Sequence, residues 1–351
     1  MMRYLKTILL FIICSVLSIL IGFTHLPLAW LFGSLIGTLL FIRYFGTKFW
    51  YPRWFGDSGV FLMGFQIGSS LTAVALVAML ADLLNIVIIS FLVLLLSLSL
   101  SRMFMKLTRS SLETAILASV PGALSQMLIM AEENKNADIM LVSLTQMSRI
   151  VLIVLIVPFI AQFFPSEGET GTALVVPHLT EVLTPLMILI PLGGILMYVF
   201  LKKIKFPAAI MLGPVLVMII WNLTTGITFT LDIALINFAQ ILFGIRIGLQ
   251  ISTLLSQLAK RLIFIILMQN ILLIMGTLVI VLIYQFFTTH SFNTLFLAAA
   301  PGGLAQIIVI ALETGGDISI ISSYHIFRIF FIILFIVPLV DFYLRRHASK
   351  A

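Results

Sequence analysis

The sequence has little charge and almost no cysteine. Lys and Arg number 20 and Asp and Glu 13 in 351 residues, so that 9 % of the chain is charged and 62 % is apolar. A soluble domain carries about 25 % charged residues, and a chain of this length cannot cover a water-facing surface with so few. Apolar runs of about 20 residues, the span of a bilayer core, recur along the chain. The composition therefore excludes a cytosolic enzyme, a secreted disulfide domain, a coiled coil and a disordered chain. It predicts an all-α polytopic membrane protein.

Residue patterns that bind metals and cofactors are also missing. The single cysteine, Cys14, cannot form a disulfide within the chain, and the five histidines are scattered. The sequence has no zinc, copper or haem spacing, no phosphate-binding glycine loop and no catalytic carboxylate pair. We therefore expect no enzymatic activity, no metal and no cofactor. The net charge of +7 does not indicate nucleic acid, because membrane proteins concentrate Lys and Arg in cytoplasmic loops. The expected partners are the lipid bilayer and a small solute.

The chain contains an internal repeat. When the sequence is placed on itself with a shift of 180 residues, Gly64 and Gly68 meet Gly244 and Gly248, and segment 121–126 meets 301–306. After a slip of one residue, four polar positions match in order: Asp138 with Asp317, Ser143 with Ser322, Gln146 with His325, and Arg149 with Arg328. Apolar composition alone does not align proline, glycine and arginine in this order. We predict a first membrane repeat over 1–164, an exposed linker over 165–181, and a second membrane repeat over 182–351 that ends in a short basic cytoplasmic tail.

The basic residues predict how the two copies cross the membrane. Each copy has six apolar segments, and if all twelve crossed, five basic residues of the second copy would lie outside the cell: Lys202, Lys203, Lys205, Lys260 and Arg261. If the fifth segment of each copy instead enters and leaves on one side, every Lys and Arg in a loop is cytoplasmic, as is usual in membrane proteins. Each copy then has about five spanning helices plus one re-entrant segment, and the two copies have inverted topology. Both termini are expected in the cytoplasm.

Proline and glycine mark the middle of each fifth segment. These are Pro121 and Gly122 in the first copy, and Pro301, Gly302 and Gly303 in the second. Proline removes a backbone donor and glycine adds backbone freedom, so we expect a break in the helix. A break at membrane depth exposes amide donors at the start of the second half-helix, where an anion is favoured. The other interpretation is a kinked helix that spans the membrane.

Each sixth segment carries a polar stripe that ends in a cation. The stripes are Ser143, Gln146 and Arg149 in the first copy, and Ser322, His325 and Arg328 in the second. Residues three apart lie on one face of a helix. Each arginine follows an aspartate by 11 residues, or about 16 Å along a helix, which is near the middle of a bilayer core. A cation at this depth faces the protein interior or a cavity. It either clamps an anionic solute or binds the carbonyls that the helix break leaves free.

Two further pairs of polar residues have two interpretations each. Gln126 and Gln306 follow the breaks and either line the solute site or join helices by hydrogen bonds. Asp138 and Asp317 open the sixth segments and either cap these helices or bind a coupling proton or sodium ion. The Gly-x-x-x-Gly patterns at 64–68 and 244–248 are expected to let helices pack closely.

These motifs resemble one membrane protein family. The duplicated P-G-[GA]-L-x-Q block, followed by A-x-E, an Asp and [QH]-x-x-R on the next helix, resembles the AbrB-type duplicated membrane protein family. Members bear names such as AbrB family transcriptional regulator and ammonia monooxygenase. The resemblance covers nearly the whole chain and implies a multi-pass protein of the bacterial inner membrane, with an effect on gene expression proposed for a member. The family pattern has P-G-G and more often Glu where Gln126 and Gln306 stand, and these amides argue against a proton-binding role of this position.

The function expected from these features is secondary transport. The solute is small and anionic or polar, and its site lies between the two broken segments with Arg149 and Arg328 as charge partners. The alternative is a membrane sensor or regulatory protein that binds a solute without moving it and affects gene expression indirectly. A transporter accumulates solute when it is supplied with a gradient, whereas a sensor only binds solute until its sites are saturated. By analogy with similar scaffolds, we expect a homo-oligomer.

Overall fold

The computed structural model describes residues 2–24, 28–47, 49–122, 124–134, 136–164, 179, 185–204, 206, 208–257 and 260–340. Among these residues, six helices are long and apolar enough to cross a membrane, and they confirm the predicted class of an all-α polytopic membrane protein. They are α1 (Met2–Gly22), α5 (Leu83–Thr108), α8 (Ile139–Phe163), α11 (Ile233–Gln257), α12 (Lys260–Tyr284) and α15 (Ile318–Phe331), the last of which continues through a π-helical turn (Ile332–Ile336). The predicted linker, apart from Leu179, and the basic tail lie outside the described residues.

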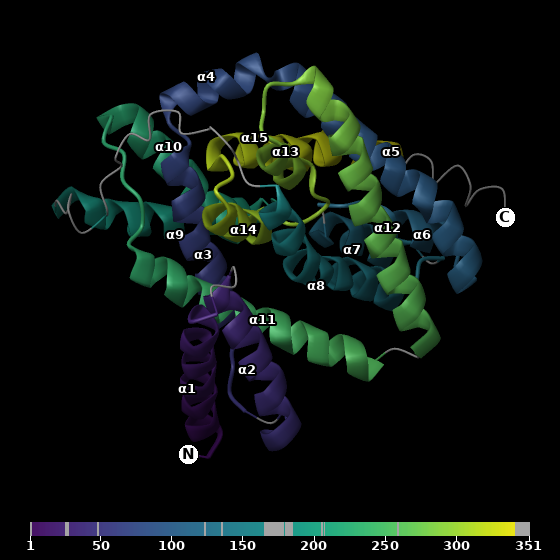
Figure 1. The fold of residues 1–351 in the computed structure, drawn as a ribbon, viewed down its shortest axis with the longest axis horizontal. Coiled ribbons are helices and arrows are strands. Elements are labelled where there is room, and N and C mark those ends of the chain that lie inside the picture. The colour runs from purple at the N-terminus through teal and green to yellow at the C-terminus, as the bar shows by residue number, and fades with distance from the viewer. Residues whose placement is uncertain are drawn as a thin grey trace. The chain divides into compact units, whose positions relative to one another are not determined.

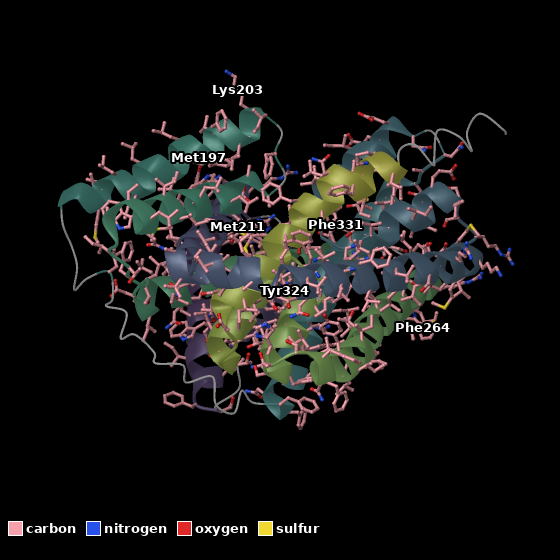
Figure 2. The ribbon with its side chains drawn as sticks, turned by 90° about the horizontal axis from the view of Figure 1, so that it is seen from above. Met197, Lys203, Met211, Phe264, Tyr324 and Phe331 are labelled. Atoms are coloured by element: carbon pink, nitrogen blue, oxygen red, sulfur yellow. The ribbon has the colours of Figure 1, made fainter. Side chains whose placement is uncertain are left out.

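The other helices are shorter. α2 (Ala29–Phe45) and α10 (Ala209–Thr225) have 17 residues each, or about 26 Å of helix, slightly less than a bilayer core. The remaining helices are α3 (Arg53–Ser70), α4 (Ala73–Ala81), α6 (Leu112–Ser119), α7 (Leu124–Glu133), α9 (Leu189–Lys203), α13 (Phe292–Ala299) and α14 (Leu304–Thr314), with short 3-10 turns at Pro185–Ile188 and Gln285–Phe287. Lys203 extends outward from the end of α9 (Figure 2). The count of five spanning helices per copy stays a prediction.

The chain forms two compact units, and each takes parts of both sequence repeats. The first unit comprises residues 1–77, 168–256 and 308–313, and the second comprises 78–167, 257–307 and 314–351. The first unit therefore holds α1, α2 and α3 together with α9, α10 and α11. The second holds α5 to α8 together with α12, α13 and α15. Broadly, the first three predicted segments of both copies fold together, and so do the last three.

In the first unit, glycines let α3 and α11 approach other helices closely. A Cβ atom on Gly64 or Gly68 of α3 would lie within 2.8 Å of a carbonyl oxygen of α10, and α3 runs beside α10 (Figure 1). On α11, a Cβ on Gly244 or Gly248 would lie within 3.1 Å of a carbonyl oxygen of α2. The oxygens belong to Met211 and Val215 in α10 and to the corresponding Leu31 and Leu35 in α2. The predicted packing role of both Gly-x-x-x-Gly patterns is confirmed.

The third apolar segment of the first copy is bent. α3 ends at Ser70, and α4 begins at Ala73 after a bend of 80°. The hydroxyls of Ser69 and Ser70 donate to carbonyl oxygens one turn back, which competes with the helical backbone bonds. Thr72 Oγ1 accepts an amide N–H of α4 and caps that helix. Hydroxyl side chains, rather than proline or glycine, accompany this break.

In the second unit, α5 and α12 run antiparallel. Near the start of α5, Asn85 accepts a hydrogen bond of 2.6 Å from Tyr284 Oη at the end of α12. Near the end of α5, the Leu107 carbonyl accepts one of 3.5 Å from Arg261 at the start of α12. Between these ends, a Cβ on Gly276 of α12 would meet the Leu96 side chain of α5 at 2.6 Å.

Both fifth segments are interrupted at the predicted positions. α6 ends at Ser119 and α7 begins at Leu124, while α13 ends at Ala299 and α14 begins at Leu304. The helix is therefore interrupted at both Pro-Gly positions. Re-entry of these segments on one membrane face stays a prediction.

Candidate functional site

Arg149 closes the end of the half-helix α6. Its guanidinium donates to the side chains of Gln146 and Asn270, both at 3.1 Å. It also donates to three carbonyl oxygens at the C-terminal end of α6, those of Ala118 at 2.9 Å, Ser119 at 2.8 Å and Val120 at 3.2 Å. A helix leaves its last carbonyls without partners and carries partial negative charge at this end, so a cation is stabilised there. These five bonds match the five N–H donors of an arginine.

Arg328 holds the equivalent place at the end of α13, but its Nε atom has no partner among the described residues. Its Nη1 donates to Ala299 O at 3.1 Å, and its Nη2 lies 3.3 Å from Gly302 O and 2.6 Å from His325 Nδ1. The Nε atom is buried and has no hydrogen-bond partner among the described residues. The side chain as a whole is 2 % exposed. Among the described residues, Arg328 makes three bonds with its five N–H donors, and its Nε–H is left for a ligand or a water molecule.

The difference between the two arginines has a cause in the sequence. Arg149 Nε donates to Asn270 of α12, which also bonds Thr145 O and Ser148 Oγ of α8. At the position of α5 that corresponds to Asn270 stands Ser90. The first copy therefore offers no amide at this position to bind the last donor of Arg328.

Gln146 and His325 hold their arginines in the same way. Gln146 Nε2 donates to Leu117 O at 3.0 Å, and its Oε1 accepts from the arginine of its stripe. His325 Nε2 lies 3.0 Å from the corresponding Leu297 O, while Nδ1 lies 2.6 Å from Arg328 Nη2. Because a guanidinium can only donate, Nδ1 is the acceptor and Nε2 carries the proton that is donated to Leu297 O. His325 is thus a neutral imidazole in the place of an amide.

Each break lies against the arginine helix of the other copy. A Cβ on Gly122, whose φ is +94°, would lie 3.4 Å from Ile332 Cδ1 and 3.7 Å from Arg328 Nε. A Cβ on Gly302 would lie 2.8 Å from Ile153 Cδ1. Ile153 and Ile332 correspond in the repeat, so the two contacts are reciprocal. Since glycine has no side chain, no Cβ atom of the first break lies against the unpartnered Nε of Arg328.

The two arginines concentrate positive charge inside the second unit. Their guanidinium groups repel each other. Among the described residues, neither arginine lies within ion-pair distance of a carboxylate, and the ion pairs there are Arg246 with Asp57 and His290 with Asp82. A cation in the bilayer core costs about 2.5–3.5 kcal/mol on insertion scales. The carbonyl dipoles offset part of this cost, and a bound anion would offset more.

The other predicted site residues are less closely joined to the arginines. Ser322 Oγ and Gln306 Oε1 are both buried and have no hydrogen-bond partner among the described residues. The side-chain amide of Gln306 lies close to Gly303. Gln126 is half-buried, and the half-buried Ser143 contacts Met147 Sδ at 3.9 Å.

Asp138 and Asp317 cap α8 and α15. Asp138 accepts from the Leu141 amide at 3.0 Å, and Asp317 accepts from the Ser319 and Ile320 amides at 2.8 and 3.1 Å. Capping satisfies their carboxylates within their own helices, as expected for an aspartate at a helix start. Their role in ion coupling stays a prediction.

Sequence reasoning missed the amide side chains of α12. Asn270 completes the Arg149 site, and Gln269 Nε2 lies 3.3 Å from Ser119 Oγ. Two adjacent amides inside an apolar segment were a usable signal, because polar groups at this depth are costly unless bonded. Within the residues that the structure describes, no three His, Cys, Asp or Glu side chains gather into a metal site.

Comparison with known proteins places the chain in a family. The family model described as "Transition state regulatory protein AbrB" matches residues 30–344. The chain belongs to the AbrB family. The matched residues include both breaks and both arginine helices, so the AbrB match covers the whole candidate site.

Two curated relatives are similar over most of their length. The chain is 24 % identical over 314 residues to "Uncharacterized protein YhjN" of Bacillus subtilis (strain 168), which is 85 % of this chain and 80 % of the relative. It is 27 % identical over 327 residues to "Putative regulator AbrB" of Escherichia coli (strain K12), which is 91 % of this chain and 92 % of the relative.

Proposed function

We propose that this AbrB-family protein is a secondary transporter of a small anionic or polar solute in the bacterial inner membrane. The observation that carries the proposal is a buried pair of arginines without a carboxylate partner among the described residues, one of which has a free N–H beside a glycine. A transporter of this kind holds its solute at discontinuous helices near the bilayer midplane. We further propose that the protein has no enzymatic step and assembles as a homo-oligomer.

The inverted orientation of the two copies is part of this proposal. α5 and α12 correspond in the repeat and run antiparallel, as the contacts of Asn85 with Tyr284 and of Leu107 with Arg261 indicate. The contact of His290 Nε2 with Asp82 at 3.0 Å gives further support. Twelve spans would separate these two residues to opposite membrane faces, whereas ten spans bring both to the outer face. Both termini then lie in the cytoplasm.

The proposed solute site is centred on Arg328. Three features favour a ligand there: its Nε and the Ser322 hydroxyl on the same helix have no partner among the described residues, and Gly122 beside the Nε has no side chain. Arg149 has no free donor and serves mainly to fix the end of α6. A carboxylate would gain a charge-assisted hydrogen bond from Nε and attraction from both guanidiniums. Alternating access would come from motion of the broken segments against the other helices.

A sensor or regulatory protein is the second candidate. It is favoured by the name of the Escherichia coli relative, a regulator. A solute bound at Arg328 but not released on the other side would give such a protein a signal, and its effect on gene expression would be indirect.

Counterflow in proteoliposomes tests the two candidates. Vesicles containing the purified protein are loaded with unlabelled lactate, succinate or citrate, and uptake of the same labelled acid is followed. We expect transient accumulation of at least one acid. Arg328→Ala should abolish it, and Ser322→Ala should reduce it. Arg246→Lys, which changes a cation in the first unit, is the matched control and should behave like the wild type.

The pattern of results separates the candidates. If none of the acids shows counterflow but one of them raises the thermal stability of the wild type and not of Arg328→Ala, the sensor is supported. If neither counterflow nor stabilisation occurs, an anionic solute at Arg328 is rejected.

A further inference from the structure

A second polar cluster lies in the second unit, around Asp82 at the junction of α4 and α5. Asp82 Oδ2 lies 3.0 Å from His290 Nε2 and accepts a hydrogen bond of 2.7 Å from Tyr324 Oη. Asp82 Oδ1 accepts from Asn85 at 2.5 Å, and Asn85 accepts from Tyr284 Oη at 2.6 Å. The cluster joins α5, α12, α15 and the loop before α13. None of its members was singled out in the sequence, because they are up to 242 residues apart.

The cluster connects water to the interior. The side chains of His290 and Asp82 are 16 % and 15 % exposed, while Tyr324 is 1 % exposed. The titratable groups that face one another are Asp82, His290, Tyr284 and Tyr324, and no described Lys or Arg bonds to them. With a neutral imidazole the cluster carries one negative charge, and with an imidazolium it is neutral. Imidazole is the side chain that changes charge between about pH 5 and 8.

α15 links the cluster to the proposed solute site. Tyr324 precedes Arg328 by four residues on this helix, or about 6 Å of rise, and Figure 2 labels Tyr324 and Phe331 along it. A change in the charge of Asp82 and His290 acts directly on the hydrogen bond that holds Tyr324. It also changes the electrostatic potential in the unit that contains both arginines.

We propose that Asp82 and His290 form the proton-binding site that couples solute movement to a proton gradient, with Tyr324 as a positioning residue. This inference rests on the proposed transport function. Hydronium gives a proton to the free lone pair on His290 Nδ1, so that one N–H bond forms and water is released. The neutralised cluster repels an anion less, and by linkage a bound anion favours proton uptake to the same degree. Proton and anion therefore move in the same direction.

Gradient-driven uptake, compared with counterflow, tests the proton site. Proteoliposomes with an alkaline interior are given labelled lactate, succinate or citrate, and initial uptake is divided by the counterflow rate of the same preparation. Coupling energies between sites are typically 1–3 kcal/mol, so the ratio should fall about 5- to 150-fold in His290→Gln and Asp82→Asn. Tyr324→Phe should lower it less. Asp57→Asn, which also removes a carboxylate from an ion pair, should leave the ratio unchanged.

The outcomes keep the two proposals apart. Counterflow by the wild type together with an unchanged ratio in His290→Gln overturns the proton site and leaves transport standing. Absence of counterflow for every acid removes transport itself. In that case nitrogen-15 spectra of labelled histidines in the full-length protein decide whether the cluster binds a proton, with His290→Gln used for assignment. A second N–H proton on His290 at acidic pH, lost or shifted in Asp82→Asn, supports the site, and an imidazole that stays neutral to pH 5 rejects it.

Discussion

His325 and Gln146 are different side chains at corresponding positions, and each accepts from an arginine and donates to a half-helix carbonyl. His325→Gln should preserve both bonds, whereas His325→Leu leaves buried polar groups without partners. Each such group costs about 1–3 kcal/mol. Thermal unfolding in detergent should therefore show His325→Leu melting well below the wild type and His325→Gln close to it. Equal melting of all three proteins would contradict the bonding inferred for the imidazole.

The two arginines should respond differently to lysine. Lysine has three donors on a flexible stem and cannot reproduce the planar fork of arginine. Arg149 makes five bonds, to three carbonyls and two amides, and Arg149→Lys can replace at most three of them, so we expect a loss of several kcal/mol in stability and poor yield of folded protein. Arg328→Lys breaks fewer bonds and should fold better while losing most counterflow. Size-exclusion profiles and counterflow, measured on both variants, check this. The reverse order would place the solute at Arg149 instead.

At the scale of helices, the glycine contacts make a matched prediction. Gly64→Ala and Gly244→Ala each put a methyl group within about 2.5 Å of a carbonyl oxygen of a neighbouring helix, so the helices must separate. Overpacking of this kind costs about 1–3 kcal/mol, and both variants should melt below the wild type. Gly22→Ala is the control, because a Cβ there meets no atom within 4 Å. The close packing would be refuted if Gly64→Ala and Gly244→Ala had the same melting temperature as Gly22→Ala.

Helix ends were predictable where one residue type decides them. Proline and glycine interrupt α6–α7 and α13–α14, and Asp138 and Asp317 cap the helices that follow, because these effects act within a few residues. The bend after Ser70 escaped prediction, since serine and threonine end a helix only when their hydroxyls bond to the backbone instead of another group. Local sequence was therefore enough to predict the broken segments but not the bend after Ser70.

The partners of the arginines were harder to predict than their positions. Depth in the membrane required that Arg149 and Arg328 be buried and bonded, which the structure bears out. Both interpretations of an arginine, solute clamp and structural cap, were compatible with that requirement. The choice depends on Asn270, 121 residues away from Arg149 in sequence, and on the serine, Ser90, that stands at the corresponding position of the first copy. Only the tertiary structure brings that amide to the guanidinium.

At the scale of the whole molecule, both compact units mix the two repeats, so the repeats cannot be separate folding domains in the usual sense. Reciprocal contacts, such as Gly122 with Ile332 and Gly302 with Ile153, tie one copy to the other in the second unit. A two-fold relation between similar halves produces such pairs of contacts. How this two-fold relation is oriented to the membrane is measured by the labelling experiment described next.

Cysteine labelling in intact cells tests the orientation of the copies. In a Cys14→Ala background, single cysteines are placed at Ser166, Lys203, Lys260, Thr289 and Asn136 and exposed to an impermeant thiol reagent. Because ten spans with inverted copies bring every loop Lys and Arg inside, only Ser166→Cys and Thr289→Cys should react. Permeabilised cells, in which the cytoplasmic sites become reachable, are the control. Labelling at Lys203→Cys and Lys260→Cys in intact cells would mean twelve spans with parallel copies. Asp82 and His290 would then face opposite sides of the membrane, which is incompatible with their 3.0 Å contact and with the proposed proton site.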